Sequence, residues 1–158
     1  MQVQDFMNND VSVCTPGTNA STAAEMMWRK NCGILPVVED GRVVGTVTDR
    51  DLFIALGTSN RRPSELHVGE IMHRDIASCD PGSDIRTALR TMAQRRLRRL
   101  PVVDDQGTLK GILSLSDIAL RAPDDVSMDL LYAVRAILDR RDHRKAAERE
   151  RWIQQQAA

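Results

Sequence analysis

The stretch LPVVEDGRVVGTVTDRD at residues 35–51 returns later in the chain as LPVVDDQGTLKGILSLSD at residues 100–117. In both copies two apolar runs flank an acidic turn and then lead into the pattern G-x-x-[ST]-x-x-D. A turn rich in Asp and Gly between two β-branched runs is typical of a β-hairpin. Ser or Thr followed three residues later by an acidic residue is typical of a helix start. The stretch therefore predicts a hairpin that leads into a helix, twice.

The similarity extends outward on both sides of this stretch. Identities begin at Val3 and Val68, at an offset of 65 residues, and pass through the Pro-Gly turns at 16–17 and 81–82. One inserted residue, Gln106, moves the offset to 66 for the remainder. So many collinear identities with a single gap indicate an internal duplication.

Each copy is expected to fold as β-α-β-β-α. The first strands are predicted at residues 11–14 and 76–79, before the Pro-Gly turns. Amphipathic helices follow, the second one with Ser83 as its expected N-cap. Their apolar residues lie at i, i+3, i+4 and i+7; they are Ala20, Ala23, Ala24 and Met27 in the first copy, and Ile85, Ala88, Leu89 and Met92 in the second.

A copy of about 50 residues buries too little surface to be stable alone, so the two copies should pack around a pseudo-twofold axis. The predicted fold class is α/β (α+β). The predicted parts are repeat one at 1–57, a polar linker at 58–66, repeat two at 67–122, and a C-terminal helix with a charged tail at 123–158.

The C-terminal segment changes in character after Pro123. An apolar stripe predicts a helix; it comprises Val126, Leu130, Leu131, Val134, Ile137 and Leu138. The sequence beyond Asp139 is dominated by charged residues and alanine. One interpretation is a helix that docks on the repeats, followed by a solvated tail. The other is a helix for dimerisation or for a protein partner, with Trp152 and Ile153 as its additional apolar residues.

Composition excludes several classes of protein. The 158 residues carry 22 basic and 22 acidic side chains, and this balance argues against a protein that wraps DNA. No apolar run approaches the roughly 18 residues that cross a bilayer, and no secretory signal begins the sequence. Three cysteines do not form a disulfide framework. We therefore expect a soluble, reduced, cytoplasmic protein.

Residues that carry chemistry are scarce. The three histidines, His67, His73 and His143, have no metal-ligand spacing, and no C-x-x-C occurs. Cys14 and Cys79 occupy equivalent positions in the two repeats, and we interpret them as small buried residues of the core. No nucleophile elbow, P-loop or dinucleotide-binding glycine motif occurs in the sequence. We expect no metal site, no cofactor and no catalytic activity.

The repeated G-x-x-[ST]-x-x-D pattern has two interpretations. It can be a capping box that satisfies N–H groups at a helix start. It can also place a hydroxyl and N–H groups where they bind an anion, with a carboxylate one turn later that accepts from sugar hydroxyls. Phosphate and ribose recognition together describe a nucleotide site.

These motifs resemble those of the CBS-domain pair, or Bateman module, and the resemblance covers residues 3 to about 121. It implies a regulatory module that binds an adenosyl ligand (AMP, ADP, ATP, S-adenosylmethionine or NADH) in clefts between the repeats. By position it assigns phosphate and ribose contacts to Thr48 with Asp51 and to Ser114 with Asp117, and Arg50 adds a cation to the first copy only. The adenine contacts that it implies are Val11, Ile34 and Pro36, and Ile76, Arg99 and Pro101.

The arginine run at residues 95–99 also has two interpretations. It is either solvated charge at a helix C-terminus or a polyphosphate-binding rim. Because residues 30–33 of the first copy hold a single charge, we expect the two clefts to bind nucleotide unequally.

The leading hypothesis is a stand-alone nucleotide sensor that forms a homodimer and modulates an unidentified protein target. The alternative is an interaction module whose clefts stay empty. A DNA-associated regulator is a remote third hypothesis.

Overall fold

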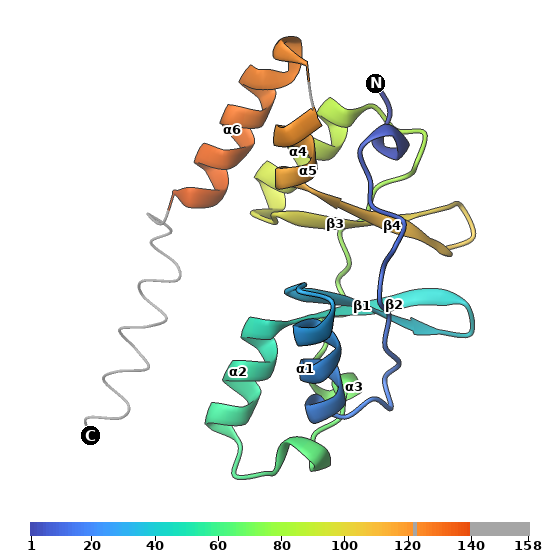
Figure 1. Cartoon of the computed structure of the whole chain (residues 1–158), viewed down its shortest axis with the longest axis vertical. Helices are drawn as coiled ribbons and strands as arrows, with labels where there is room; N and C mark the ends of the chain where they lie inside the picture. Colours follow the sequence, from blue (N-terminus) through green and yellow to red (C-terminus); the bar gives the residue numbers. More distant parts are fainter. Residues whose placement is uncertain (122, 140–158) are drawn as a thin grey trace.

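The structure is a computed structural model that describes residues 1–121 and 123–139. Figure 1 shows two similar units, each with a two-stranded hairpin toward the middle of the molecule and helices on the outside. The first unit consists of α1 (Ala20–Arg29), β1 (Ile34–Glu39), β2 (Arg42–Thr48) and α2 (Asp49–Thr58). The second consists of α4 (Ile85–Arg95), β3 (Arg99–Val103), β4 (Leu109–Ser114) and α5 (Leu115–Arg121). The other elements are η1 (Val3–Asp5), η2 (Pro63–Glu65), α3 (Val68–Ile71), η3 (Asp124–Val126) and α6 (Ser127–Leu138). The predicted mixed fold class with a C-terminal helix is confirmed.

The two hairpins repeat each other in detail. In the first, Val37 pairs with Gly45, and in the second Val102 pairs with Gly111. The register of each antiparallel ladder shifts directly after this pair. The duplication therefore preserves the irregularity in each hairpin as well as its strands.

The expected first strand of each copy is wrong in its extent. Only one residue in each segment pairs with the hairpin, Cys14 with Val37 and Cys79 with Val102, both in parallel. The Cys14 N–H donates to the Pro36 carbonyl at 3.1 Å, and its carbonyl accepts from the Val38 N–H at 2.8 Å. The Pro-Gly turn follows two residues later, and proline has no N–H with which to continue a ladder.

The amphipathic helices bury most of the predicted apolar positions. In α4 all four are buried, whereas α1 buries three and leaves Ala24 exposed. The expected Ser83 cap is wrong: Asp84 caps α4, since its carboxylate accepts from the Arg86 N–H at 2.8 Å. Two aliphatic cores result, one in each unit.

The N-terminal segment of each repeat packs in the core of the other repeat. Val3 and Phe6 are buried among the side chains of the second unit. Their counterpart segment, with Val68 and Met72, is buried in the first unit. Backbone pairs at Asn8–Ile112 and at His73–Thr46 fasten the two exchanged segments to the hairpins. The predicted boundaries at 57 and 67 divide the sequence, but this exchange joins the two units in space.

Helix α6 docks on the second unit, against α4 and α5 (Figure 1). Val126 and Ala133 enter the second core, and Arg86 of α4 forms ion pairs with Asp125 at 2.8 Å and Asp129 at 3.1 Å. The docking interpretation therefore describes residues 124–138, while the charged tail and Trp152 lie outside the described residues. None of the helices described in residues 1–121 and 123–139 is both long and apolar enough to span a membrane.

Candidate functional site

Two cavities lie between the repeats. The first cleft, of about 350 Å³, is lined by Ile34, Thr46, Thr48, Asp51, His73, Asp75, Ile76, Ala77, Arg95, Leu97, Arg99 and Pro101. The second cleft, of about 300 Å³, is lined by Asn8, Asp10, Val11, Ser12, Lys30, Asn31, Cys32, Ile34, Arg99, Ile112, Ser114 and Asp117. The two linings correspond position by position across the repeat, except at Pro101 and Asn31. The clefts are therefore two copies of one site, each at the lower end of the usual ligand-pocket size.

In the first cleft the carboxylate of Asp51 is almost fully engaged. One oxygen accepts from the Thr48 N–H at 2.9 Å and from the Thr48 hydroxyl at 2.7 Å. The other oxygen lies 2.9 Å from Nε2 of His73. Burial raises the pKa of the Asp51 carboxyl, but these hydrogen bonds outweigh burial and hold the pKa below its ordinary value. The Asp51 side chain is 15% exposed and carries a negative charge at neutral pH.

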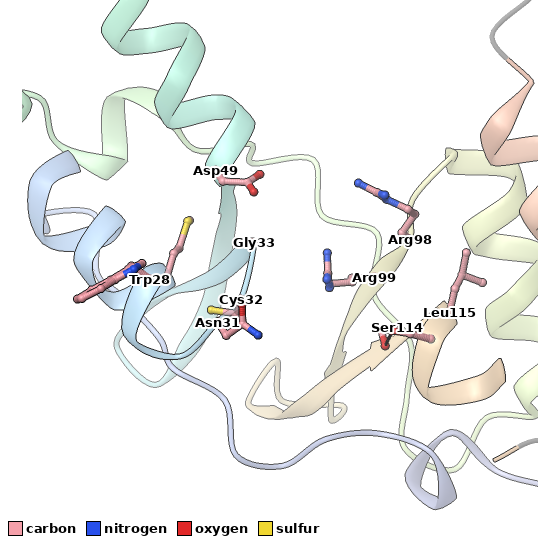
Figure 2. Close-up of a pocket in the computed structure, with 11 residues that line it drawn as sticks. Trp28, Asn31, Cys32, Gly33, Asp49, Arg98, Arg99, Ser114 and Leu115 are labelled. Carbon is pink, nitrogen blue, oxygen red and sulfur yellow. Dashed lines mark hydrogen bonds between the residues drawn. The ribbon is translucent and has the colours of Figure 1, made fainter. Parts of the chain in front are cut away.

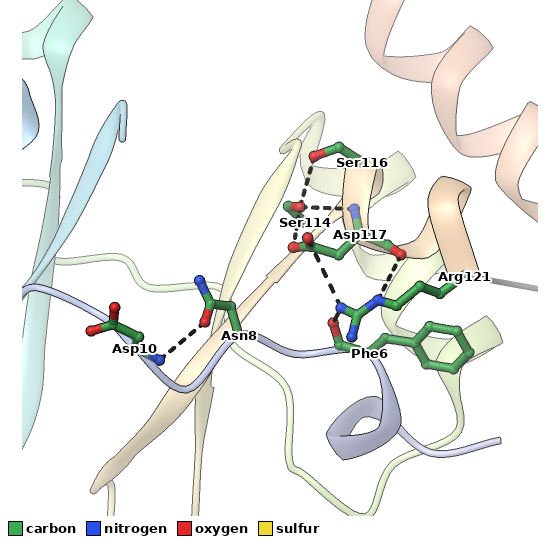
Figure 3. Close-up of polar contacts among 7 residues, drawn as sticks. All are labelled: Phe6, Asn8, Asp10, Ser114, Ser116, Asp117 and Arg121. Carbon is green, nitrogen blue, oxygen red and sulfur yellow. Dashed lines mark hydrogen bonds and ion pairs between the residues drawn. The ribbon is translucent and has the colours of Figure 1, made fainter. Parts of the chain in front are cut away.

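In the second cleft the equivalent carboxylate has different partners (Figure 3). Asp117 accepts a short hydrogen bond from the Ser114 hydroxyl, which also lies 2.9 Å from the Ser116 hydroxyl. The guanidinium of Arg121 lies 3.9 Å from Asp117 and donates to the Phe6 carbonyl. The Asp117 side chain is 33% exposed, about twice as exposed as Asp51. A histidine thus faces one cleft carboxylate and an arginine lies beside the other.

The capping interpretation is confirmed in full at Thr48, where Asp51 also accepts from the Thr48 N–H, and at Ser114 for the hydroxyl contact. The hydroxyl of Thr48 accepts from the Asp51 N–H at 3.2 Å, and that of Ser114 accepts from the Asp117 N–H at 3.1 Å. At the start of α2 the other N–H groups also have partners: Asp49 donates to the Gly33 carbonyl and Arg50 to the Asp49 carboxylate. The N–H groups at the start of α2 are therefore already engaged within the protein. Side chains must supply most of any phosphate contact at this position.

The apolar residues that the resemblance assigned to adenine lie in the clefts, with one exception. Ile34, Ile76 and Pro101 line the first cleft, and Val11 with Ile34 lines the second. Ile34 and Arg99 occupy matching positions, and both line both clefts. Pro36 lines neither cleft; it is buried in the β1–β2 hairpin, where its carbonyl accepts from the Cys14 N–H. The expectation for Pro36 is corrected.

The sequence analysis missed several residues of the clefts. His73 and its repeat mate Asn8 come from the exchanged segments. An ion pair occurs at the same place in each cleft: Arg95 binds Asp75 through two contacts of 2.9 and 3.1 Å, and Lys30 lies 3.4 Å from Asp10. Their matching offsets are visible in the sequence, but only the fold shows that they belong to the clefts.

Arg50 does not line a cleft. It lies in a groove of about 230 Å³ that continues from the first cleft, since Ile34, Thr48, Leu97 and Arg99 line both cavities. Arg96 and Arg98 also line this groove. The cation that distinguishes the first copy of the motif is therefore placed beyond the Thr48 end of the cleft.

The cysteines and acidic side chains form no metal centre in the described ranges 1–121 and 123–139. Burial raises the pKa of the Cys14 thiol to about 11 and that of Cys79 to about 12. Both therefore stay protonated at neutral pH and react slowly as nucleophiles.

Comparisons with known proteins agree with the duplicated architecture. The family model described as "CBS domain" matches residues 3–58 and 68–124. A CBS domain-containing protein YhcV of Bacillus subtilis is 37% identical over 118 residues, which cover 75% of this chain and 83% of that protein.

Two solved structures with bound ligands are also similar. CBSX2 in complex with AMP has a TM-score of 0.65 and 29% identity, and the match covers 75% of this chain and 93% of that one. The CBS domain pair of protein MJ0100 in complex with 5′-methylthioadenosine and S-adenosyl-L-methionine has a TM-score of 0.69 and 25% identity. That match covers 76% of this chain and 98% of that one.

Proposed function

The chain belongs to the CBS-domain family, and we propose that it is a non-catalytic sensor that binds an adenine nucleotide between its repeats and modulates a protein partner. The observation that carries this proposal is the first cleft. Its lining combines the charged, part-buried carboxylate of Asp51 with the apolar side chains of Ile34, Ile76 and Pro101. A nucleoside has the matching distribution of groups, with two ribose hydroxyls that donate to a carboxylate and a base that packs against apolar side chains.

The roles that we assign to the residues are those that the resemblance to the CBS-domain pair implies. Asp51 accepts the ribose hydroxyls in place of some of its present partners, and Thr48 faces the 5′ side. Asp117 and Ser114 have the same roles in the second cleft, with Val11 against the base. AMP, ADP, ATP, NADH and S-adenosylmethionine are the candidate ligands. The complexes of CBSX2 with AMP and of MJ0100 with adenosyl compounds support this ligand class.

Binding has a structural consequence because both repeats build each cleft. In the first cleft Thr48 and Asp51 belong to the first unit, while Arg99 and Pro101 belong to the second. A ligand that contacts both sides favours one relative position of the units over others. This is a means of signalling to a partner without catalysis.

The partner surface is proposed to lie on the outer helices, and a second copy of the chain is the first candidate for it. Trp28 of α1 is 82% exposed, Phe53 of α2 is 78% exposed and Leu120 of α5 is 84% exposed. Such side chains are commoner in interfaces than on free surfaces. Light scattering tests for this homodimer by comparing the molar mass of the wild type with that of Phe53→Glu. The proposed location of the protein is the cytoplasm.

Ligand binding is tested by a thermal-shift screen with the five candidate ligands on the full chain. A ligand at 100 times its dissociation constant adds about 2.7 kcal/mol to the stability of the folded state. Asp51→Ala and Asp117→Ala should each abolish the response of one cleft. Asp84→Ala is the matched control, because it removes a capping carboxylate outside both clefts.

The control separates the two roles of the motif. A pure cap predicts that all three variants lose stability and that none loses ligand response. A ribose contact predicts that only the two cleft variants lose the response. If no candidate ligand stabilises the wild type, the chain is an interaction module with empty clefts, which is the alternative function.

A further inference from the structure

The groove beyond the first cleft, here the first groove, has a strongly basic lining. Arg50 comes from the first turn of α2, and Arg96, Arg98 and Arg99 come from the end of α4 and the start of β3. Asp49 supplies the single carboxylate of this lining. Within residues 1–121 and 123–139, the side chains of Arg50, Arg98 and Arg99 have no acidic partner within 4.0 Å. An anion is therefore the missing counterpart of this groove.

The corresponding cavity beside the second cleft, here the second groove, has a volume of about 570 Å³ and is less basic (Figure 2). Where the first groove has Arg50 and Arg96, the repeat mates here are Ser116 and Asn31. Arg98 and Arg99 line this groove too, and Figure 2 shows both between the start of α2 and the Ser114 end of β4. The two grooves therefore share two arginines, while the other two belong to the first groove alone.

We infer that the first cleft selects a nucleoside 5′-di- or triphosphate, whose phosphate chain lies in the first groove, and that one such ligand binds per chain. This rests on the proposed function and specifies its ligand. A guanidinium is always charged and its donors match phosphate oxygens, so the three that have no acidic partner, those of Arg50, Arg98 and Arg99, favour several phosphate groups over one. Arg98 and Arg99 line both grooves, so two phosphate chains would compete for the same two guanidinium groups. The second cleft therefore takes an adenosyl ligand with a weakly charged 5′ end.

The test is isothermal titration of the full chain with ATP, AMP and adenosine. We expect ATP to bind at least about tenfold more tightly than AMP, as one charge-assisted contact is worth about a factor of ten. The ATP stoichiometry should be one per chain. The double variant R50S/R96N gives the first groove the side chains of the second. It should weaken ATP binding at least about tenfold and AMP binding less than about threefold.

The variant chain is expected to fold. Arg96 has a left-handed backbone with φ of 55°, and its repeat mate Asn31 has the same conformation with φ of 49°. Asparagine tolerates this region better than arginine does. R74S/R90S is the charge-matched control, since it removes two positive charges from exposed positions outside both grooves. The control should retain the ATP preference.

Each outcome decides. Equal affinities for ATP and AMP, or an equal loss of the ATP preference in the control, overturn the inference and leave the proposed nucleotide sensor intact. Two ATP molecules bound per chain with equal affinity overturn the sharing of Arg98 and Arg99. No binding of any of the three ligands overturns the inference, and the thermal-shift screen with all five candidate ligands then decides the proposed function.

Discussion

The glycine of the repeated motif makes a sharp prediction about packing. Gly111 lies in β4 directly beneath the exchanged N-terminal segment, and a Cβ atom there would be 2.7 Å from the Asn8 backbone oxygen and 3.1 Å from the Met7 sulfur. Real Cβ atoms essentially never come within 3.0 Å of a heavy atom of a residue that is not a chain neighbour. A backbone oxygen that pairs with Ile112 cannot move away without breaking that bridge. Gly111→Ala must therefore displace the segment that carries Asn8 into the second cleft.

The size of the effect follows from the atoms involved. Overpacking a tight site costs about 1–3 kcal/mol, and a backbone neighbour places Gly111→Ala in the upper half of that range. Gly45, its repeat mate, would place a Cβ atom 2.7 Å from the Met72 sulfur and 2.9 Å from the His73 oxygen. The Met72 side chain can rotate, but the His73 oxygen is backbone and accepts from the Thr46 N–H, so we expect Gly45→Ala to cost about as much as Gly111→Ala. For a chain of this length, a loss of 2–3 kcal/mol lowers the melting temperature by roughly 4–12 °C.

The assay is urea unfolding followed by circular dichroism at 222 nm. Trp28 is 82% exposed, so its fluorescence reports poorly on the core. Gly57→Ala is the matched control: Gly57 lies in α2 with no atom within 4 Å of its Cβ position, and alanine there should gain up to about 1 kcal/mol. If Gly111→Ala is as stable as the wild type while Gly57→Ala behaves as stated, the tight contact between β4 and the exchanged segment is refuted.

Three further predictions concern charge and chemistry. Asp51→Asn should destabilise the chain at pH 7, because the lowered pKa of Asp51 means that the folded state is stabilised by its ionised form. This stabilisation is fully present above the ordinary pKa of 3.8 and is lost as the pH falls through the lower pKa of the folded state. In paired urea titrations the difference in stability from wild type should therefore shrink below pH 3.8 and then vanish. Iodoacetamide at pH 8 should alkylate part-exposed Cys32 first and spare Cys14 and Cys79, because burial raises the pKa of their thiols to about 11 and about 12. Peptide mass spectrometry gives the order of alkylation. A bound nucleotide should slow the reaction of Cys32, which lines the second cleft. Arg86→Ala should speed amide exchange in α6 with little change elsewhere, because it removes both ion pairs to Asp125 and Asp129; unchanged exchange would show that apolar contacts alone hold this helix.

The duplication made most of the local structure predictable from sequence. Two copies of one pattern, each with a turn between β-branched runs and a capping box, determine two hairpins and two following helices through short-range physics alone. The hairpin and following helix predicted from residues 35–51 and 100–117 agree with β1, β2 and the start of α2, and with β3, β4 and the start of α5. The fold class, both helix starts and the similarity of the two sites followed from these elements.

The long-range arrangement was not predictable in the same way. An offset of 65 residues shows that the segments at Val3 and Val68 are alike, but both would satisfy the apolar contacts of either core. Only the fold shows that they are exchanged, so that Asn8 and His73 enter the clefts. The same holds for α6, since an apolar stripe predicts burial without naming the surface that buries it.

The exchange gives a physical reason why this module requires both repeats. Each core is completed by a segment from the other repeat. Separating the two units would therefore expose Phe6, which is buried in the second core, and Met72, which is buried in the first. The segments then continue directly into the clefts, where His73 contacts the Asp51 carboxylate at 2.9 Å. A ligand that takes a place on that carboxylate must change the contact with His73 and therefore acts on the segment that closes the first core. Ligand occupancy, core packing and the relative position of the repeats are thus coupled through a few residues, which is the physical requirement for a sensor without an active site.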